Sequence, residues 1–382
     1  MSLTGGAFLG LVIALTVLAF LVVVAEWPAL AGPSPGKVAA RVGTLLVVNA
    51  LVLLTAATQL NAQYLFFADW TDLKGALTGT VTTTGLKRGG NATQAGRATV
   101  HGRAAKAAST LPPLPAGASS AQPISYTVHG PASGIVNTVI VQLPQGYTAA
   151  ANAGTRYPVI ETFQGYPSSP SRWLASDSMN LPTVMDQKVA AHEIAPALIV
   201  SPQVEIPRGF DTECVNGRPG RPQLETWLTV DVPNWVAKTF RVRTDRGSWA
   251  AMGLSTGGWC AAMASMLHPA QYGGAVVLGG YFRPEFGLYE PYPPQSALAR
   301  RYDLVALARR KPPPAAMWLE TSHADATSYS SSAAFLKAAR PPLAIEAVVL
   351  RHAGHRVGIW QALLPSTLTW LGKTLPGFAP KP

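Results

Sequence analysis

Residues 248–269, SWAAMGLSTGGWCAAMASMLHP, decide the fold of this chain. The apolar run Trp249 to Met252 is typical of a short buried strand, and Trp259 to Leu267 has the composition and spacing of a buried helix that Pro269 ends. Between them lies GLSTG, a G-x-S-x-G pattern centred on Ser255. Between a strand and a helix, this pattern predicts a nucleophile elbow, a sharp turn that exposes a serine hydroxyl. Ser255 is therefore the candidate nucleophile.

Short apolar runs alternate with helical stretches on both sides of this elbow. The runs that predict strands are 124–128, 136–143, 159–163, 197–200, 275–278, 315–319 and 345–350. Helical spacing is found over 224–240 and in a closing segment around Leu363, Leu364, Leu368 and Leu371. Strands that alternate with helices predict a mostly parallel sheet covered on both faces. We therefore expect an α/β domain over residues 123–382.

The first 68 residues predict a two-span transmembrane anchor. Residues 2–25 carry no charge, and a second uncharged run extends from 42 to 68; each is long enough to cross a hydrocarbon core of roughly 30 Å. The loop between them carries Lys37 and Arg41, so the positive-inside rule predicts a cytoplasmic loop and both ends of the chain outside. A cleaved signal peptide ending near Ala31 is the alternative, but a basic N-terminal region is missing and a second span follows.

Residues 69–122 are rich in Gly, Ala, Thr, Ser and Pro and predict a flexible tether. Scattered basic residues there include Lys74, Lys87 and Arg88, and the whole chain has a formal net charge of +11. Because the basic residues form no dense block and no recognition motif is present, nucleic acid is disfavoured as a partner. An anionic membrane surface or envelope polymer suits this charge better.

A nucleophilic serine needs a base and an acid that orients the base, in the chain order Ser, Asp or Glu, His for this kind of fold. His355 lies in a loop after the last predicted strand, where catalytic groups gather in open α/β sheets; His352 is the alternative. Asp325 follows the predicted strand 315–319, and Glu320 is the runner-up acid. His268 closes the elbow helix, and we expect it to be a capping or surface residue.

The oxyanion formed on attack must meet two backbone N–H groups. One belongs to Thr256, which follows the nucleophile, and the other should come from the loop 163–167. Gly165 permits the turn there and Pro167 cannot donate, so the N–H of Tyr166 is the second candidate donor. A metal site that uses His323, Asp325, His352 and His355 is disfavoured because the spacing matches no helical ligand pair and sulfur ligands are absent. No cofactor signature is present in the sequence.

At these motifs the chain resembles the putative esterase family, which includes feruloyl esterases, enterochelin esterases, S-formylglutathione hydrolase and the antigen 85 mycolyltransferases. The resemblance rests on 163–167, 253–258, 320–325 and 354–360 and covers residues 123–382. It implies an α/β-hydrolase fold and a triad of Ser255, Asp325 and His355. Gln164 stands where many members have His, and Arg356 stands where Asp is frequent, so the substrate stays open.

Two further features concern the surroundings of the elbow. Cys214 and Cys260 are the only cysteines. Since the domain is expected to lie outside the membrane, where disulfides are permitted, we expect a disulfide between them; two buried thiols are the alternative. The aromatic, Pro-rich insertion 281–310 suits a wall or lid over the acyl pocket, or else a packed surface excursion.

The sequence thus predicts a membrane-anchored, extracytoplasmic serine esterase that acts on an ester substrate without a cofactor. An acyltransferase that passes the acyl group to a sugar or lipid hydroxyl is the first alternative. A catalytically idle hydrolase-fold binding module is the second.

Overall fold

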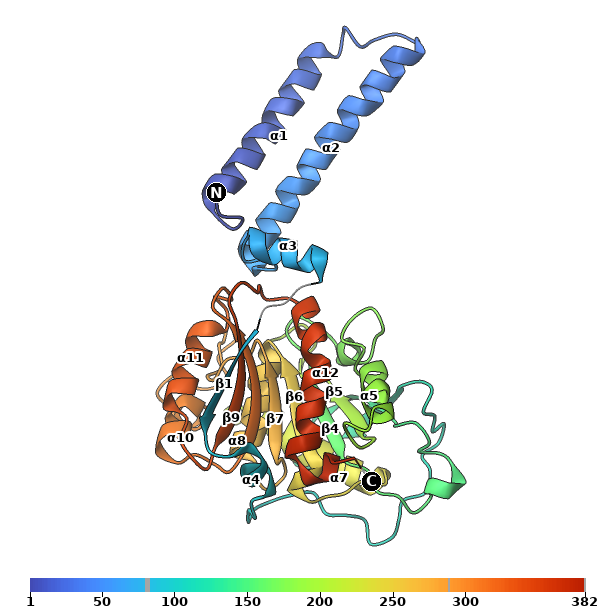
Figure 1. The fold of residues 1–382 in the computed structure, drawn as a ribbon, viewed down its shortest axis with the longest axis vertical. Coiled ribbons are helices and arrows are strands. Elements are labelled where there is room, and N and C mark those ends of the chain that lie inside the picture. Colours follow the sequence, from blue (N-terminus) through green and yellow to red (C-terminus); the bar gives the residue numbers. More distant parts are fainter. Residues whose placement is uncertain (80–82, 288, 381–382) are drawn as a thin grey trace. The chain divides into compact units, whose positions relative to one another are not determined.

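The structure is a computed structural model that describes residues 1–79, 83–287 and 289–380 (Figure 1). The chain forms two compact units. The first contains residues 1–82 together with 351–356, and the second contains residues 83–350 and 357–382. Each unit is described separately.

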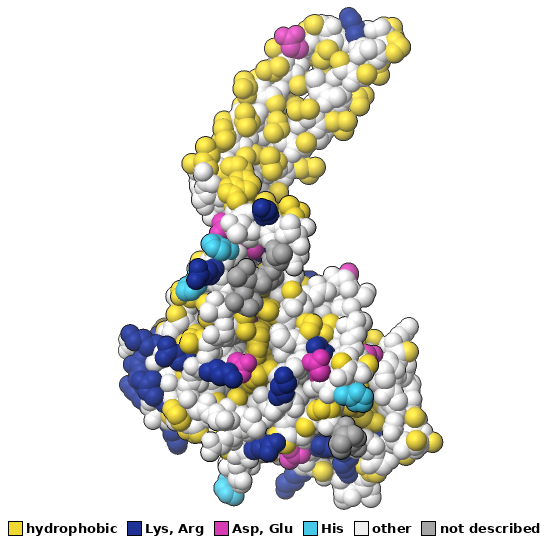
Figure 2. All heavy atoms as spheres, in the orientation of Figure 1, with side chains coloured by type: hydrophobic (Ala, Val, Ile, Leu, Met, Phe, Trp, Pro, Cys, Tyr) yellow, Lys and Arg dark blue, Asp and Glu magenta, His cyan; other side chains and the backbone are white. Residues whose placement is uncertain are grey.

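The first unit is built on two long apolar helices, α1 (Gly6–Glu26) and α2 (Pro35–Tyr64), followed by α3 (Trp70–Thr78). Hydrophobic side chains cover the outside of α1 and α2 (Figure 2). The hydroxyls of Thr16 and Thr55 lie 2.9 Å apart and join the two helices. Both helices are long and apolar enough to cross a membrane, as the sequence predicts, and a signal sequence would meet the same criterion.

The second unit is organised around one sheet of nine described strands in the order β1-β9-β8-β7-β6-β4-β5-β3-β2. From β5 across to β9 the strands run parallel, whereas β1, β2 and β3 pair antiparallel with their neighbours. The mostly parallel sheet confirms the predicted fold class. The strands are β1 (Thr83–Gly89), β2 (Ile124–His129), β3 (Val136–Gln142), β4 (Val159–Phe163), β5 (Leu198–Pro202), β6 (Trp249–Leu254), β7 (Gly274–Leu278), β8 (Ala316–Ser322) and β9 (Ala344–Leu350).

Helices cover both faces of this sheet (Figure 1). One face carries α5 (Leu181–Ala190) and α12 (Val357–Thr374), and the other carries α8 (Thr256–Leu267), α10 (Leu304–Arg310) and α11 (Tyr329–Ala338), whose apolar side chains share one core cluster. The remaining elements are α4 (Ala92–Arg97), α6 (Leu224–Thr226), α7 (Val232–Thr239), α9 (Ala297–Arg301), η1 (Ala150–Asn152), η2 (Pro170–Trp173), η3 (Trp227–Asp231), η4 (Arg246–Ser248) and η5 (Pro376–Phe378). Strands β4, β6 and β7 are buried throughout, which explains why β6 and β7 are made almost entirely of apolar residues and glycine.

The segment 69–122 differs from the flexible tether that its composition predicts. It contains α3, β1 and α4, and β1 forms the edge of the sheet beside β9. The buried guanidinium of Arg246 donates to the carbonyls of Ala95, Gly96 and Ala98 and holds the end of α4. These contacts use backbone atoms, so polar and small residues suffice for them. A search for apolar periodicity could not detect them.

Candidate active site

Ser255 lies at a strained turn between β6 and α8. Its backbone angles are φ 55° and ψ −126°, and its N–H donates to the carbonyl of Leu278 at 2.8 Å. A side chain at Gly253 would collide with the backbone of Gly257, and one at Gly257 would collide with the carbonyl of Phe163. The glycines therefore allow the close approach on which the turn depends. This is the geometry expected of a nucleophile elbow.

The two candidate oxyanion donors lie on segments that meet at this turn. Thr256 is the first residue of α8, where backbone N–H groups have no partner within the helix. A Cβ at Gly165, next to Tyr166, would lie 3.1 Å from the Cβ of Ser255, so the loop after β4 passes directly against the elbow. The Tyr166 hydroxyl donates to the carbonyl of Gly209 at 3.0 Å and fixes this loop to the one after β5.

Gln164, one of the two departures from the family pattern, is completely buried. Its side-chain amide pairs with that of Gln203 at 2.5 Å, between the ends of β4 and β5. This contact gives Gln164 a structural role beneath the loop that carries Tyr166.

The two candidate acids lie on β8 and just beyond it, and both are buried. Asp325 accepts hydrogen bonds from the N–H of Thr327 at 3.0 Å and from the hydroxyl of Ser328 at 2.6 Å. Glu320 accepts one from the indole N–H of Trp360 at 3.1 Å. Burial, with Asp325 close by, raises the pKa of Glu320 to about 8. Glu320 therefore favours the protonated form near neutral pH, whereas the donors around Asp325 suit a carboxylate.

The candidate base His355 lies in residues 351–356, which belong to the first unit. Its N–H donates to the carbonyl of Leu65 at 2.9 Å. The alternative base, His352, is exposed and its Nδ1 lies 2.7 Å from Oδ2 of Asp69. Ser255 and Asp325 belong to the second unit, so the triad stays a prediction. A side chain at Gly354 would collide with the carbonyls of Leu65 and Phe66, so glycine is needed here for close packing.

A disulfide joins Cys214 to Cys260, as the sequence predicts. It links the loop 211–217 to the first turns of α8, next to the elbow. The indole N–H of Trp259 also donates to the carbonyl of Glu213 at 2.7 Å. The loop is therefore held to the helix by a covalent bond and a hydrogen bond.

Behind the elbow lies a buried acid that sequence reasoning missed. The hydroxyl of Tyr281 lies 2.5 Å from Oε1 of Glu213 and 3.2 Å from the hydroxyl of Thr256. Burial raises the pKa of Glu213 well above its usual range, and the nearby Asp211 adds to the effect. No local motif marks Glu213, because only the fold brings it beside α8.

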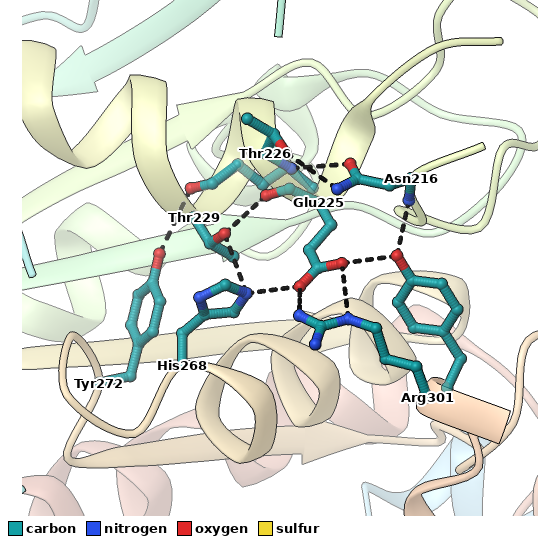
Figure 3. A network of polar contacts seen from close by, with 9 residues as sticks. Asn216, Glu225, Thr226, Thr229, His268, Tyr272 and Arg301 are labelled. Atoms are coloured by element: carbon teal, nitrogen blue, oxygen red, sulfur yellow. Dashed lines mark hydrogen bonds and ion pairs between the residues drawn. The ribbon is translucent and has the colours of Figure 1, made fainter. Parts of the chain in front are cut away.

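A second buried network fixes the insertion 281–310 to the body of the domain (Figure 3). The carboxylate of Glu225 accepts from His268 at 2.6 Å, from Tyr302 at 2.5 Å and from Arg301. The Tyr302 hydroxyl accepts in turn from the N–H of Asn216 at 2.8 Å. His268 is the C-cap residue of α8, in line with the capping role predicted from the sequence, and its side chain is mostly buried in this network. The expected lid contains α9 and α10, which the apolar pattern did not reveal.

In the part of the chain that the structure describes, no group of three or more His, Cys, Asp and Glu side chains is placed to hold a metal ion.

Comparison with known proteins adds to this geometry. A ferulic acid esterase superposes with a TM-score of 0.56 at 20% identity, over 66% of this chain and 97% of that one. The S-formylglutathione hydrolase from Agrobacterium tumefaciens gives a TM-score of 0.53 at 14% identity, over 66% and 94%. The fluorophosphonate-binding serine hydrolase F of Staphylococcus aureus gives 0.52 at 16% identity, over 65% and 98%. Because the sequence identities are 20% or lower, these structural similarities establish only that the chain shares the α/β-hydrolase fold.

Sequence comparison gives the family. An uncharacterised protein of Corynebacterium glutamicum is 29% identical over 136 residues, which are 36% of this chain. The match spans 31% of the length of that relative. The Putative esterase family matches residues 134–369, more than half of the chain and every strand from β4 to β9. The match includes the elbow at Ser255 and most of the α/β-hydrolase sheet, and the chain belongs to the Putative esterase family.

Proposed function

We propose that this protein is a membrane-anchored, extracytoplasmic serine esterase that hydrolyses carboxylic esters through an acyl-serine intermediate. The observation that carries the proposal is the conformation of Ser255, held at a positive φ between β6 and α8 in a chain of the esterase family. A strained serine at this position is what an exposed nucleophile requires.

In the proposed reaction, His355 takes the proton of Ser255 as Oγ bonds to the ester carbonyl carbon, while Asp325 orients the imidazole. The carbonyl oxygen becomes an oxyanion and meets the N–H groups of Thr256 and Tyr166. When the carbon–oxygen bond to the alcohol breaks, the alcohol takes the proton from His355. Water then attacks the acyl-serine, and its proton passes through His355 to Ser255 as the free acid leaves.

The test is labelling with a fluorophosphonate probe in the full-length protein. Wild type and a surface control, Ser330→Ala on α11, should label, whereas Ser255→Ala and His355→Ala should not. Absence of labelling in folded wild type would refute the proposal and favour the alternative, a catalytically idle hydrolase-fold binding module. If wild type labels, the released product decides between the remaining reactions: free acid indicates an esterase, and an acylated sugar or lipid indicates the acyltransferase.

The extracytoplasmic placement is part of the proposal. It is supported by Lys37 and Arg41 near the loop between the candidate spans, and by the Cys214–Cys260 disulfide, because such bonds persist in oxidising compartments. A membrane-impermeant maleimide should label Ala150→Cys in intact cells and should reach Pro33→Cys only after lysis. The reverse pattern would place the hydrolase domain in the cytoplasm.

The proposed partners are an ester substrate and an anionic envelope surface. Lys and Arg side chains gather in a dark blue area on one side of the hydrolase domain in Figure 2. The last turns of α9 and α10 are both basic, with Arg300 and Arg301 on α9 and Arg309 and Arg310 on α10. Such a surface would be attracted to anionic lipid or polymer at low salt.

A further inference from the structure

The candidate base His355 lies on a short loop that packs with the end of the candidate anchor. Residues 351–356 and residues 1–82 form one compact unit. Residues 351–356 are contacted mainly by the segment just after α2. A simple tether would make no such contacts.

Asp72 is the centre of these contacts. Its side chain is 4% exposed, and Oδ2 accepts three hydrogen bonds. The donors are the N–H of Ala68 at 3.0 Å, the N–H of Gly354 at 2.8 Å and the guanidinium of Arg356 at 2.6 Å. The residues before and after His355 are thus bound to the same carboxylate. Hydrogen bonds to a charged acceptor in a buried place are among the stronger ones in proteins.

Backbone contacts complete this attachment. The N–H of His355 donates to the carbonyl of Leu65, the residue that ends α2 in a left-handed conformation. The guanidinium of Arg356 donates to the carbonyl of Phe66 at 3.0 Å and lies over the ring of Phe67, 4.8 Å from its centre. Because Gly354 has no side chain, the carbonyls of Leu65 and Phe66 can approach its backbone closely.

The segment that makes these contacts is itself fixed to the helical hairpin. The side-chain amide of Asn61 on α2 pairs with the backbone of Phe67 through bonds of 2.7 and 2.9 Å. The indole of Trp70 donates to the carbonyl of Met1 at 3.0 Å and packs against the ring of Phe8 on α1. A continuous set of contacts therefore joins both long helices to the loop of His355.

We propose that Asp72 is a positioning residue for the esterase reaction, and that the end of the anchor sets the place of His355. The inference rests on the proposed function, in which His355 is the base. A base held by a fixed loop keeps its imidazole in the geometry for proton transfer, and a misplacement of about 1 Å can cost about 100-fold in rate. The anchor then has a part in catalysis as well as in location.

The experiment uses the full-length protein in detergent or lipid nanodiscs. Asp72→Ala should lower kcat for a p-nitrophenyl ester by about 10-fold or more with little change in KM. Asp72→Asn keeps an oxygen that can accept from Gly354, so its loss should be smaller. Asp186→Ala on α5 removes a partly exposed carboxylate that accepts a hydrogen bond from the side-chain amide of Gln145, so it is the matched control and should behave as wild type.

Hydrogen exchange gives a readout that is independent of activity. In wild type, the amides of Gly354 and His355 should be protected, because both donate hydrogen bonds within this unit. Asp72→Ala should speed exchange in peptides covering 351–356 and leave peptides from β6 and α8 unchanged. A fall in kcat with unchanged exchange at 351–356, or unchanged kcat with intact labelling, would overturn the inference.

The outcomes separate this inference from the proposed function. If folded wild type fails to label with fluorophosphonate, the esterase proposal fails. If wild type labels and His355→Ala does not, while Asp72→Ala matches Asp186→Ala in kcat and in exchange, only the inference about Asp72 fails. Should Asp72→Ala be recovered unfolded, the graded response of Asp72→Asn decides the question.

Discussion

The indole N–H of Trp360 donates a hydrogen bond to Oε2 of Glu320 at 3.1 Å. This contact occupies an oxygen of the carboxyl group that competes with Asp325 for the part of the catalytic acid. With its pKa raised to about 8 by burial, Glu320 is largely protonated at neutral pH. A neutral acid is poorly suited to stabilise an imidazolium.

The two acids can be told apart by amide substitutions. Glu320→Gln imitates the protonated side chain and still accepts from Trp360, so kcat at pH 7 should stay within about 3-fold of wild type, a change of less than 1 kcal/mol. Asp325→Asn should lower kcat by about 10³-fold or more, because the amide supports the wrong imidazole tautomer. Ester hydrolysis measured with both variants checks this; the opposite ranking would make Glu320 the acid.

Glu161, buried on β4, should make the domain less stable at alkaline pH. Burial raises its pKa from 4.5 to about 8, even though Tyr272 donates a hydrogen bond to it at 2.7 Å. The unfolded carboxyl loses its proton first, so the free energy of unfolding should fall as pH rises from about 4.5 to 8. Glu161→Gln should remove much of this slope and gain on the order of 3 kcal/mol relative to wild type at pH 8.

Thermal unfolding at pH 5 and pH 8 would measure the effect of Glu161→Gln. Glu346→Gln on β9 is a suitable control because Glu346 is partly exposed beside Lys87. Equal pH slopes in wild type and Glu161→Gln would show that Glu161 is ionised in the folded protein.

Glu225 should show the opposite pH dependence. Burial alone would raise its pKa, but hydrogen bonds from His268 and Arg301 outweigh burial and lower the pKa to about 2. Its contribution to stability is therefore present above the unfolded value of 4.5 and is lost as pH falls toward 2. Glu225→Gln should destabilise the domain by about 2–3 kcal/mol at pH 7 and by much less at pH 3.

The Glu225 prediction can be checked by denaturant unfolding at these two pH values, with Glu290→Gln in the insertion as the control. A cost that is the same at both values would mean that the carboxylate charge contributes nothing to this network.

Loss of the disulfide should weaken the elbow region. Cys214 and Cys260 are separated by 46 positions, and a link over such a loop stabilises a protein by about 2–4 kcal/mol. The double variant Cys214→Ser/Cys260→Ser should unfold at a lower temperature than wild type under oxidising conditions. Adding a reductant should lower the Tm of wild type and leave that of the double variant unchanged. A reductant-insensitive Tm in wild type would contradict the prediction.

The predictable part of this protein was local in sequence. The strand, turn and helix around Ser255 lie in one continuous stretch of sequence. The strands β4 to β9 can likewise be predicted from their own residues, without knowledge of distant contacts. The pairing of Cys214 with Cys260 followed because only one pair is possible.

The parts that could not be predicted depend on contacts between distant segments. Tyr281 meets Glu213, and Gly354 meets Asp72, only because the fold brings their backbones together. Edge strand β1 is stabilised by backbone pairing with β9, and such pairing does not require apolar side chains. Its composition therefore resembles that of a linker. Neither charge pattern nor hydrophobic period records such contacts.

The pairing of β1 with β9 has a practical consequence for anyone who expresses the hydrolase domain alone. A truncation that begins at residue 123, where the sequence suggests that the folded domain starts, would remove β1 and expose the backbone N–H and C=O groups of β9. An uncovered strand of this kind is a template for pairing with other chains and invites aggregation. Poor solubility of such a fragment would then reflect a missing sheet edge, and a fragment that begins at Thr83 would retain it.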